Sequence, residues 1–449
     1  MLNTCKHTMC LPRCLELFFR TALAVVSVLY VSVSCRKTEP SAPEPSFPEE
    51  IDNVLVIYAA GKNNLAGDIR TNIEDFCEGY LPAGGDRNIL LIYSRLSSSY
   101  NPCPSYLERA YMYQGRIVRD TVRTYAEDRN AADADMLSEV LSDARELFPG
   151  KGYGLLFSSH ATGWLPAGYY GNSDKYDRLM SAGNARYSSG QIRIPGLPEG
   201  SVPYVELLYD PSRPMVKSIG QDRMSSGGSS LSYEIDLNDF AEAIPMHLDY
   251  IFFDCCLMGG IETAYELKDK CDRIIFSPTE VLSTGFNYST MGVQLLGGSQ
   301  PDLVKVCSDY YDRYNAMSGD WKSATVTLID CSRLEPLAEA CRLIFSNHRE
   351  ALDQLTGEGI QQYFQYNYHW FYDLRDIAVK AGASRMELDL LDSVLDNCII
   401  YKAATERFIT FPINTYSGLS MYLPGNGSAY LDNFYRNLKW NQATGLVSE

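Results

Sequence analysis

The sequence predicts an α/β fold in which a mainly parallel sheet is covered by helices on both faces. Continuous apolar runs of strand length, such as 53–60 and 250–253, suit strands that are buried on both sides. Longer segments between these runs carry apolar residues at helical spacing, and this alternation is typical of parallel sheets joined by helices. The 449-residue chain, with 45% hydrophobic and 21% charged residues, also has the composition of a folded protein with a large core.

The expected elements alternate along the chain. A hairpin over 111–125 should turn at Gln114-Gly115, and Asp133 should cap the helix that follows it. The crossovers between parallel strands should be right-handed. The expected strands are 53–60, 88–93, 153–160, 250–256, 273–277 and 324–330. The expected helices are a stretch that ends near Phe76, then 134–148, 236–243, 259–268, 301–314 and 334–347.

Composition divides the chain into four parts. A leader, 1–35, and a tether rich in Pro, Glu and Ser, 36–51, precede the main domain, 52–357. Within that domain, 165–231 is a long insertion with many Gly, Ser, Pro and Tyr residues, and a loop of this length is usually functional or mobile. The Tyr- and Asn-rich segment 358–449 ends in apparent strands and predicts a smaller C-terminal subdomain packed on the sheet.

The leader has the features of an export signal. Basic residues precede a short apolar run, 21–34, which is too short to span a bilayer comfortably. Ser34-Cys35 resembles the cleavage site of bacterial lipoproteins, although Ser32 stands where such sites usually carry Leu or Val. We therefore expect export and a lipid anchor on Cys35, with the protein held at the cell envelope, in the outer membrane or at the cell surface. An ordinary signal peptide with a coincidental cysteine is the alternative.

Charge and cysteine content limit the possible partners. The net charge of −17 argues against a nucleic-acid partner, which would require a basic surface. Four of the 13 cysteines lie in the leader, and the odd number that remains has irregular spacing, so a disulfide framework is not indicated. The sequence has no C-x-x-C pair and no H-E-x-x-H motif, so neither a zinc site nor another cofactor is expected. A calcium requirement stays open.

Two of the expected strands end in side chains that can act together. His160 ends one strand, and Cys255-Cys256 ends another, so both should reach the same edge of the sheet. A thiol beside an imidazole is a candidate nucleophile–base pair, and the backbone N–H groups of Ala161 and Cys256 could stabilise an oxyanion. Cys256 is nearer the following helix, whose dipole favours a thiolate. The alternative is that this histidine and these cysteines are ordinary core residues.

Several motifs resemble those of the clostripain family of cysteine peptidases. Residues 254–259 (DCCLMG) and 262–267 (ETAYEL) resemble the family's D-x-C-L-M…E-x-A-Y-E-L signature. Residues 160–164 resemble its H-G-x-G-W histidine motif, and 58–65 (YAAGKNNL) resembles its first strand and N-N-L turn. Residues 277–288 resemble the strand and G-W-x-Y segment beyond the cysteine.

The resemblance extends from about 53 to about 314 and implies a caspase-like fold. It implies a Cys–His dyad, with Cys256 as nucleophile and His160 as base, and cleavage of protein or peptide substrates after Arg or Lys. Asp254 matches an acidic position that can pair with the cationic side chain of the substrate. Alternatively, the Asp254 carboxylate only caps the end of the strand.

Three positions depart from the family pattern. Ala161 replaces the glycine after the histidine and loses access to positive φ, and Phe286 replaces a tryptophan. Thr284 stands where an acidic residue often helps the substrate pocket to hold a cation, and Glu280 could substitute for it. These departures leave open a second hypothesis, a catalytically inactive surface protein that keeps the fold and binds peptides or glycans.

The insertion 165–231 also suggests self-processing. Members of the resembled family can mature by self-cleavage between the histidine and cysteine motifs, and exposed Gly/Ser-rich loops are where nicking concentrates. Among the basic residues of the insertion, Lys175 and Arg178 are the expected cleavage sites. The alternative is an unprocessed insertion that only shapes the substrate cleft.

Overall fold

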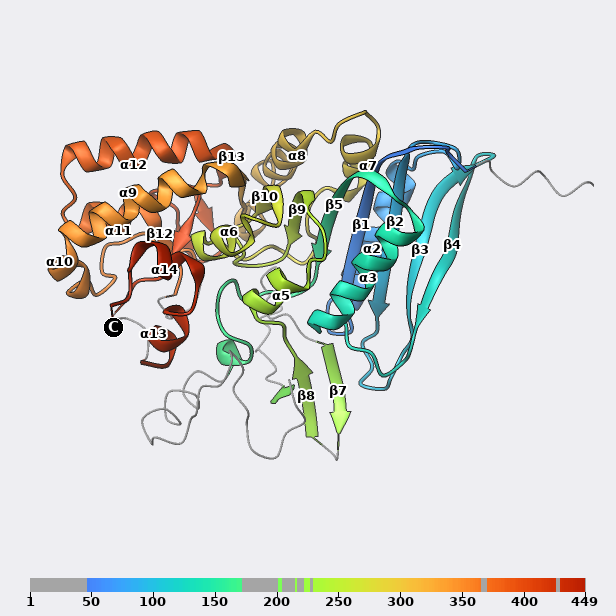
Figure 1. The fold of residues 1–449 in the computed structure, drawn as a ribbon, viewed down its shortest axis with the longest axis horizontal. Helices are drawn as coiled ribbons and strands as arrows, with labels where there is room; N and C mark the ends of the chain where they lie inside the picture. The colour runs from blue at the N-terminus through green and yellow to red at the C-terminus, as the bar shows by residue number, and fades with distance from the viewer. Residues whose placement is uncertain are drawn as a thin grey trace, which may run out of the picture. The chain divides into compact units, whose positions relative to one another are not determined.

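The structure is a computed structural model that describes residues 47–171, 201–203, 215, 222–226, 229–364, 370–424 and 429–448. A nine-stranded sheet forms its centre (Figure 1). The strands, in order across the sheet, are β13 (Ile399–Ala404), β11 (Thr325–Asp330), β10 (Cys271–Phe276), β9 (Leu248–Asp254), β5 (Gly150–Ser158), β1 (Ile51–Gly61), β2 (Asn88–Leu96), β3 (Ser105–Tyr113) and β4 (Arg116–Tyr125).

The centre of the sheet is parallel and its two ends are antiparallel. Strands β2, β1, β5, β9 and β10 run parallel, which confirms the expected mainly parallel sheet. The β3–β4 hairpin turns at Gln114 and Gly115, as expected, and both residues have the positive φ of a tight hairpin turn. Two successive helices connect β10 to β11, so the chain runs the length of the strands twice and enters β11 at the edge where β10 ends. β11 is therefore antiparallel to β10.

Helices cover both faces of the sheet. The crossovers from β1 to β2 and from β5 to β9 run in opposite directions along the sheet, so the right-handed rule predicts opposite faces for α2 (Ala66–Gly79) and α5 (Leu237–Ala243). α7 (Tyr288–Leu296) packs against α2, and α3 (Ala134–Leu147) packs against α5. The expected cap on α3 is present, since the Asp133 side chain accepts from the backbone of Asp135. The remaining helices are α6 (Ile261–Leu267), α8 (Leu303–Asn315), α9 (Leu334–Asn347), α10 (Arg349–Asp353), α11 (Leu374–Lys380), α12 (Arg385–Cys398), α13 (Ala429–Tyr435) and α14 (Lys439–Thr444), with 3-10 turns at Gly319–Trp321 and Cys331–Arg333.

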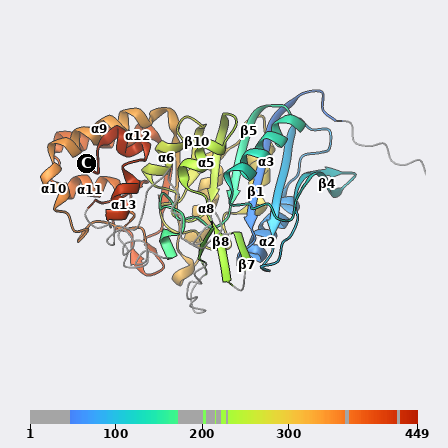
Figure 2. The ribbon, with the colours of Figure 1, turned by 60° about the horizontal axis from the view of Figure 1, so that its bottom comes forward.

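The C-terminal segment extends the main sheet. Its strand β13 pairs with β11, and residues Phe47–Glu449 form one compact unit. Helices α9 to α12 gather at this end of the sheet, away from the β3–β4 hairpin (Figures 1 and 2). Of the strands expected over 418–423, only β16 (Ser420–Met421) is formed, paired with β12 (Tyr372–Asp373), and a two-strand sheet of β14 (Arg407–Phe408) and β15 (Phe411–Pro412) accompanies it.

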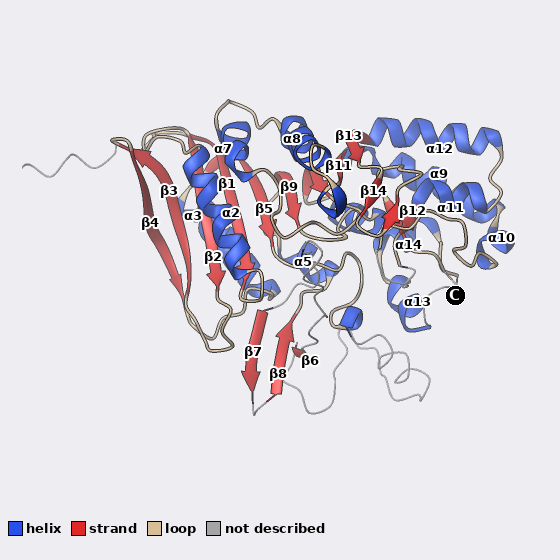
Figure 3. Ribbon diagram, turned by 180° about the vertical axis from the view of Figure 1, so that it is seen from behind, coloured by secondary structure: helices blue, strands red, loops and turns tan. Residues whose placement is uncertain are grey.

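The insertion contains more regular structure than its sequence suggests. β6 (Ser201–Pro203), β7 (Asp222–Ser226) and β8 (Ser229–Tyr233) form a small antiparallel sheet, which Figure 3 shows near α5. Asp222 attaches this sheet to the main one, because its carboxylate lies 2.8 Å from Arg95 Nε and 3.6 Å from Lys62 Nζ. All three side chains are almost completely buried. Removing one partner alone would leave an unpaired buried charge, so single substitutions at this contact should be strongly destabilising.

Some expectations fall outside the described residues. These are the leader with Cys35, most of the tether, and the expected cleavage sites Lys175 and Arg178. Within the part that the structure describes, no helix has the length and apolar character needed to cross a membrane. The same part holds no group of three or more His, Cys, Asp and Glu side chains placed to bind a metal ion.

Candidate active site

His160 and Cys256 leave the sheet at the same edge. Strands β5 and β9 are parallel neighbours, and Ser158 is paired in register with Asp254 at their carboxyl ends. His160 lies two positions after Ser158, and Cys256 lies two positions after Asp254. Topology therefore brings the imidazole and the thiol to adjacent strand ends, where open α/β sheets place their ligand sites.

Alternation along these two strands separates the site into two sides. The rings of Phe157 and Phe253 lie against Phe240 of α5, with centroid distances of 5.2 and 5.6 Å. Successive side chains of a strand point to opposite faces, so Ser158 and Asp254 face away from α5. The edge that carries His160 thus lies between an apolar α5 side and a polar α7 side.

The two adjacent thiols have different surroundings. Cys255 is buried and its Sγ donates to the carbonyl of Phe157 at 3.2 Å. Cys256 is also buried, and its Sγ lies against the backbone of Val281, accepting from the N–H at 3.1 Å and donating to the carbonyl at 3.6 Å. Because α6 begins only at Ile261, the helix-dipole argument for Cys256 is weak, whereas the Val281 N–H donates directly to this sulfur.

The segment after Cys256 is held in an unusual conformation. Leu257 has a φ of 61°, which is rare for a residue with a branched side chain and is typical of strained functional sites. Its N–H donates to Thr279 O at 2.9 Å, which fixes it to the segment after β10. Gly163, also at positive φ, approaches so closely that a Cβ there would lie 2.5 Å from Leu257 O. The glycine of the histidine motif is therefore required for the histidine and cysteine segments to meet.

Ala161 fits its position without strain. Its φ is not positive, so replacing the family's glycine demands no left-handed backbone. The residue lines the same pocket as His160. The first departure from the family pattern therefore does not by itself argue for loss of activity.

Asn64 is a site residue that the sequence analysis did not identify. Its Oδ1 lies 2.7 Å from Nε2 of His160, which orients the imidazole. The adjacent Asn63 shapes the turn, since its Oδ1 accepts from the N–H of Leu65 at 2.9 Å. The N-N-L turn was visible in the sequence, but its pairing with a residue 96 positions away was not.

Asp254 lies on the polar side of the site. It is fully buried, and its Oδ2 accepts from Tyr288 at 2.6 Å and from Ser158 at 3.3 Å. Burial and the neighbouring Asp254 carboxylate raise the pKa of Tyr288 well above its usual value, so this hydroxyl remains a donor. The Thr284 hydroxyl lies 2.8 Å from that of Tyr314, and Glu280 is fully buried.

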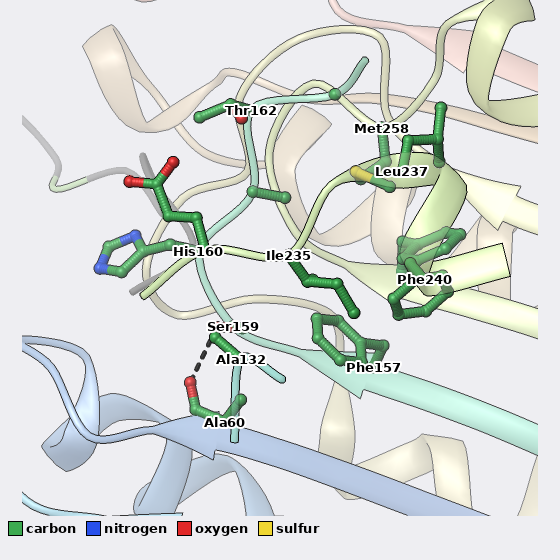
Figure 4. Close-up of a pocket in the computed structure, with 14 residues that line it drawn as sticks. Ala60, Ala132, Phe157, Ser159, His160, Thr162, Ile235, Leu237, Phe240 and Met258 are labelled. Carbon is green, nitrogen blue, oxygen red and sulfur yellow. Dashed lines mark hydrogen bonds between the residues drawn. The ribbon is translucent and has the colours of Figure 1, made fainter. Parts of the chain in front are cut away.

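A pocket opens beside His160 on the other side (Figure 4). It encloses about 580 Å³ of empty space, including the part open to solvent. Figure 4 shows the imidazole of His160 at one end of the pocket and the rings of Phe157 and Phe240 at the other. Cys256, Asp254, Thr284 and Glu280 are not among the lining residues, which are Ala60, Ala132, Phe157, Ser159, His160, Ala161, Thr162, Gly163, Glu234, Ile235, Leu237, Phe240, Phe253 and Met258.

The insertion contacts both sides of the site. The carbonyl of Met215 accepts from the N–H of Ser283 at 2.8 Å, beside Thr284 and two residues from Val281. On the α5 side, the Asp236 carboxylate accepts from the N–H of Ala167 at 2.6 Å, and burial raises the pKa of Asp236 to about 7. The insertion is thus fixed to the segment that contacts the Cys256 thiol.

Several solved structures are similar to this chain in fold. An inactive zymogen C11 protease from Parabacteroides distasonis is 25% identical, covers 89% of this chain and 99% of its own, and has a TM-score of 0.68. A secreted C11 cysteine protease from Bacteroides thetaiotaomicron, iotapain, is 22% identical over 88% of this chain and 99% of its own, with a TM-score of 0.66. A secreted C11 cysteine protease from the same organism, in complex with an irreversible peptide inhibitor, is 21% identical with the same coverage and TM-score. The comparison with curated proteins gives no significant match.

These structures share the caspase-like α/β sheet described above, which confirms the expected fold class. The family model described as the clostripain family matches residues 207–446, more than half of the chain. The chain therefore belongs to the clostripain family of cysteine peptidases.

Proposed function

We propose that this cysteine peptidase cleaves peptide bonds after Arg or Lys through a Cys256–His160 dyad. The observation that carries the proposal is the placement of both residues two positions beyond the register pair Ser158–Asp254. A cationic P1 side chain on the polar side would approach the buried Asp254 carboxylate, a charge-assisted contact that favours Arg and Lys over neutral residues.

The reaction follows from these roles. His160 takes the proton from the Cys256 thiol, and the sulfur attacks the scissile carbonyl carbon. The N–H groups of Ala161 and Cys256 stabilise the oxyanion, and the protonated His160 then gives its proton to the leaving amine. Water, deprotonated by His160, hydrolyses the thioester and regenerates the thiol. Because the thiol is buried against Val281 in the intact chain, it must turn toward His160 before it can attack.

A covalent probe tests the proposal directly. A peptidyl-Arg acyloxymethyl ketone should alkylate the processed wild-type protein once, as measured by intact mass, and peptide mapping should place the adduct on Cys256. Cys256→Ala should give no adduct, and the same probe with a neutral P1 residue should react more slowly. No adduct on any form of the wild type would favour the inactive, peptide- or glycan-binding alternative.

Asn64 is proposed to position His160. Asn64→Ala should lower kcat/KM roughly 10–100-fold, because the imidazole loses the acceptor that fixes its orientation. Asn64→Asp places a carboxylate against the imidazole and favours its protonated form, so the pH–rate profile should move to higher pH. Asn397→Ala, at an exposed position on α12, is the control. Equal losses in both Asn64 variants with an unmoved pH profile would mean that Asn64 only supports the fold.

The insertion is proposed to cover the substrate site until it is cut once, at Lys175 or Arg178. The bond between Met215 and Ser283 and the burial of the Cys256 thiol support this proposal. Purified wild type should give two fragments on a denaturing gel, while Cys256→Ala and a Lys175→Ala/Arg178→Ala variant stay intact. A wild type that remains one chain while fully active would show that the insertion is only a wall of the cleft.

The protein is further proposed to be exported and lipid-anchored through Cys35. The support is the Ser34-Cys35 sequence after the apolar run of the leader. Incorporation of a labelled fatty acid that disappears in Cys35→Ser tests the anchor, and equal labelling of both proteins would refute it.

A further inference from the structure

The pocket beside His160 lies on the opposite side of the catalytic edge from Asp254. Phe157 and Phe253 point into it from the α5 face, whereas Asp254, next in sequence to Phe253, bonds to Tyr288 of α7. Strand alternation separates the two positions across the sheet. The proposed P1 contact and this pocket are therefore different places, with His160 between them.

We propose that this pocket is the subsite for the P1′ residue, the first residue on the leaving-group side of the scissile bond, and that it selects an apolar side chain. The inference rests on the proposed dyad. His160 must give its proton to the leaving nitrogen, so the P1′ residue begins within hydrogen-bond reach of the imidazole. His160 and the three residues after it line the pocket, so the P1′ side chain has this cavity beside it while the P1 side chain occupies the other face.

The lining explains the chemical preference. Apolar side chains line the end of the pocket away from the His160 imidazole, namely Phe157, Leu237, Phe240 and Met258 in Figure 4, with Phe253 against Phe240. Moving a charged group into such surroundings without a partner is costly, whereas a Leu, Met or Phe side chain gains from leaving water. The charged lining group other than His160 is Glu234, whose Oε2 accepts from the N–H of Gly168 at 2.6 Å. An acidic P1′ residue would meet this like charge, so Asp and Glu should be the poorest residues there.

Ile235 is the position at which to change the preference. It is partly exposed, and Figure 4 shows its side chain directed toward Phe157. Ile235→Glu would place a carboxylate in the apolar space by changing a residue that packs on the core but is not itself fully buried. The matched control is Ile117→Glu, the same chemical change at a 43% exposed position on the edge strand β4.

The experiment uses internally quenched peptides that are identical except for the P1′ residue, all with Arg at P1. The wild type should cleave the Leu, Met and Phe peptides with a kcat/KM roughly 10-fold or more above that of the Asp peptide. Ile235→Glu should remove this advantage and raise the relative rate for a Lys peptide, while Ile117→Glu keeps the wild-type ranking. Ala132→Leu, which narrows the pocket, should penalise Phe at P1′ more than Ala.

Two different failures are distinguishable. A peptidyl-Arg aminocoumarin substrate carries the same leaving group in every assay and no P1′ amino acid, so its hydrolysis tests the dyad and the P1 site without any choice of P1′ side chain. If it is hydrolysed while all P1′ peptides are cleaved at equal rates, or while Ile235→Glu and Ala132→Leu keep the wild-type ranking, the pocket is not the P1′ subsite. If neither kind of substrate with Arg or Lys at P1 is cleaved by processed protein, the proposed function itself fails.

Discussion

Cys256→Ala and His160→Ala should each lower kcat for a peptidyl-Arg substrate by roughly 10⁴–10⁶-fold. The thiol forms the covalent intermediate, and the imidazole carries the proton in both directions, so removing either side chain removes a step that the other cannot perform. Members of one catalytic unit are not additive, and the double variant should be no slower than either single one. Initial rates of hydrolysis of a peptidyl-Arg aminocoumarin substrate give these values. Variants that cannot cleave their own insertion are cut in trans before the assay.

Cys255→Ala is the matched control for the nucleophile. It removes the neighbouring buried thiol, whose bond to Phe157 O gives it a packing role, and should keep near wild-type turnover with some loss of thermal stability. The reverse result, with Cys255→Ala inactive and Cys256→Ala active, would transfer the role to Cys255. A His160→Ala protein with near wild-type turnover would remove the dyad.

The centre of the fold was predictable from sequence because its strands are buried on both faces. Residues 54–59 of β1 are at most 1% exposed, and such strands appear as unbroken apolar runs. The C-terminal end was harder, since β13 is an edge strand whose residues are only partly buried or exposed. Helix α12 nevertheless carries a signal that is readable in the sequence, the capping box of Ser384 and Glu387. Pairing of β13 with β11 depends on contacts between residues 70 to 79 positions apart, which no local pattern encodes.

The candidate site likewise has a part that the sequence predicts and a part that depends on folding. Strand ends and motifs point to His160, Cys256 and Asp254 because these residues lie at or just beyond the ends of the best-defined strands. The partner of His160 could not be read from sequence, because Asn64 reaches it from a turn after a different strand. The Cys256 contact with Val281 and the apolar pocket under α5 also depend on segments that meet only in the folded chain. Sequence patterns therefore indicate which residues react, whereas packing decides what surrounds them.

Asp254→Asn should reduce kcat/KM for Arg and Lys substrates while leaving neutral P1 substrates much less affected. The amide keeps the shape of the carboxylate and can still accept from Tyr288, but it has no charge to attract a cation. Since Asp254 is fully buried, the loss should be about 2–4 kcal/mol, or roughly 30- to 1,000-fold. A library of substrates that differ only at P1, assayed with processed wild type and variant, measures this change.

Asp373→Asn is the matched control, because Asp373 is also a buried carboxylate that accepts from a tyrosine hydroxyl, that of Tyr363 at 2.5 Å. Loss of this carboxylate should lower the melting temperature without altering the order of P1 residues, since it caps α11 and accepts from the N–H of Ser417. If Asp254→Asn lowers the rates for basic and neutral substrates equally, Asp254 holds the strand end through Ser158 and Tyr288 and does not select the substrate. A wild type that prefers neutral P1 residues would instead identify Thr284, in place of the usual acidic residue, as the position that sets specificity, because the Asp254 charge alone would then be insufficient to hold a cation.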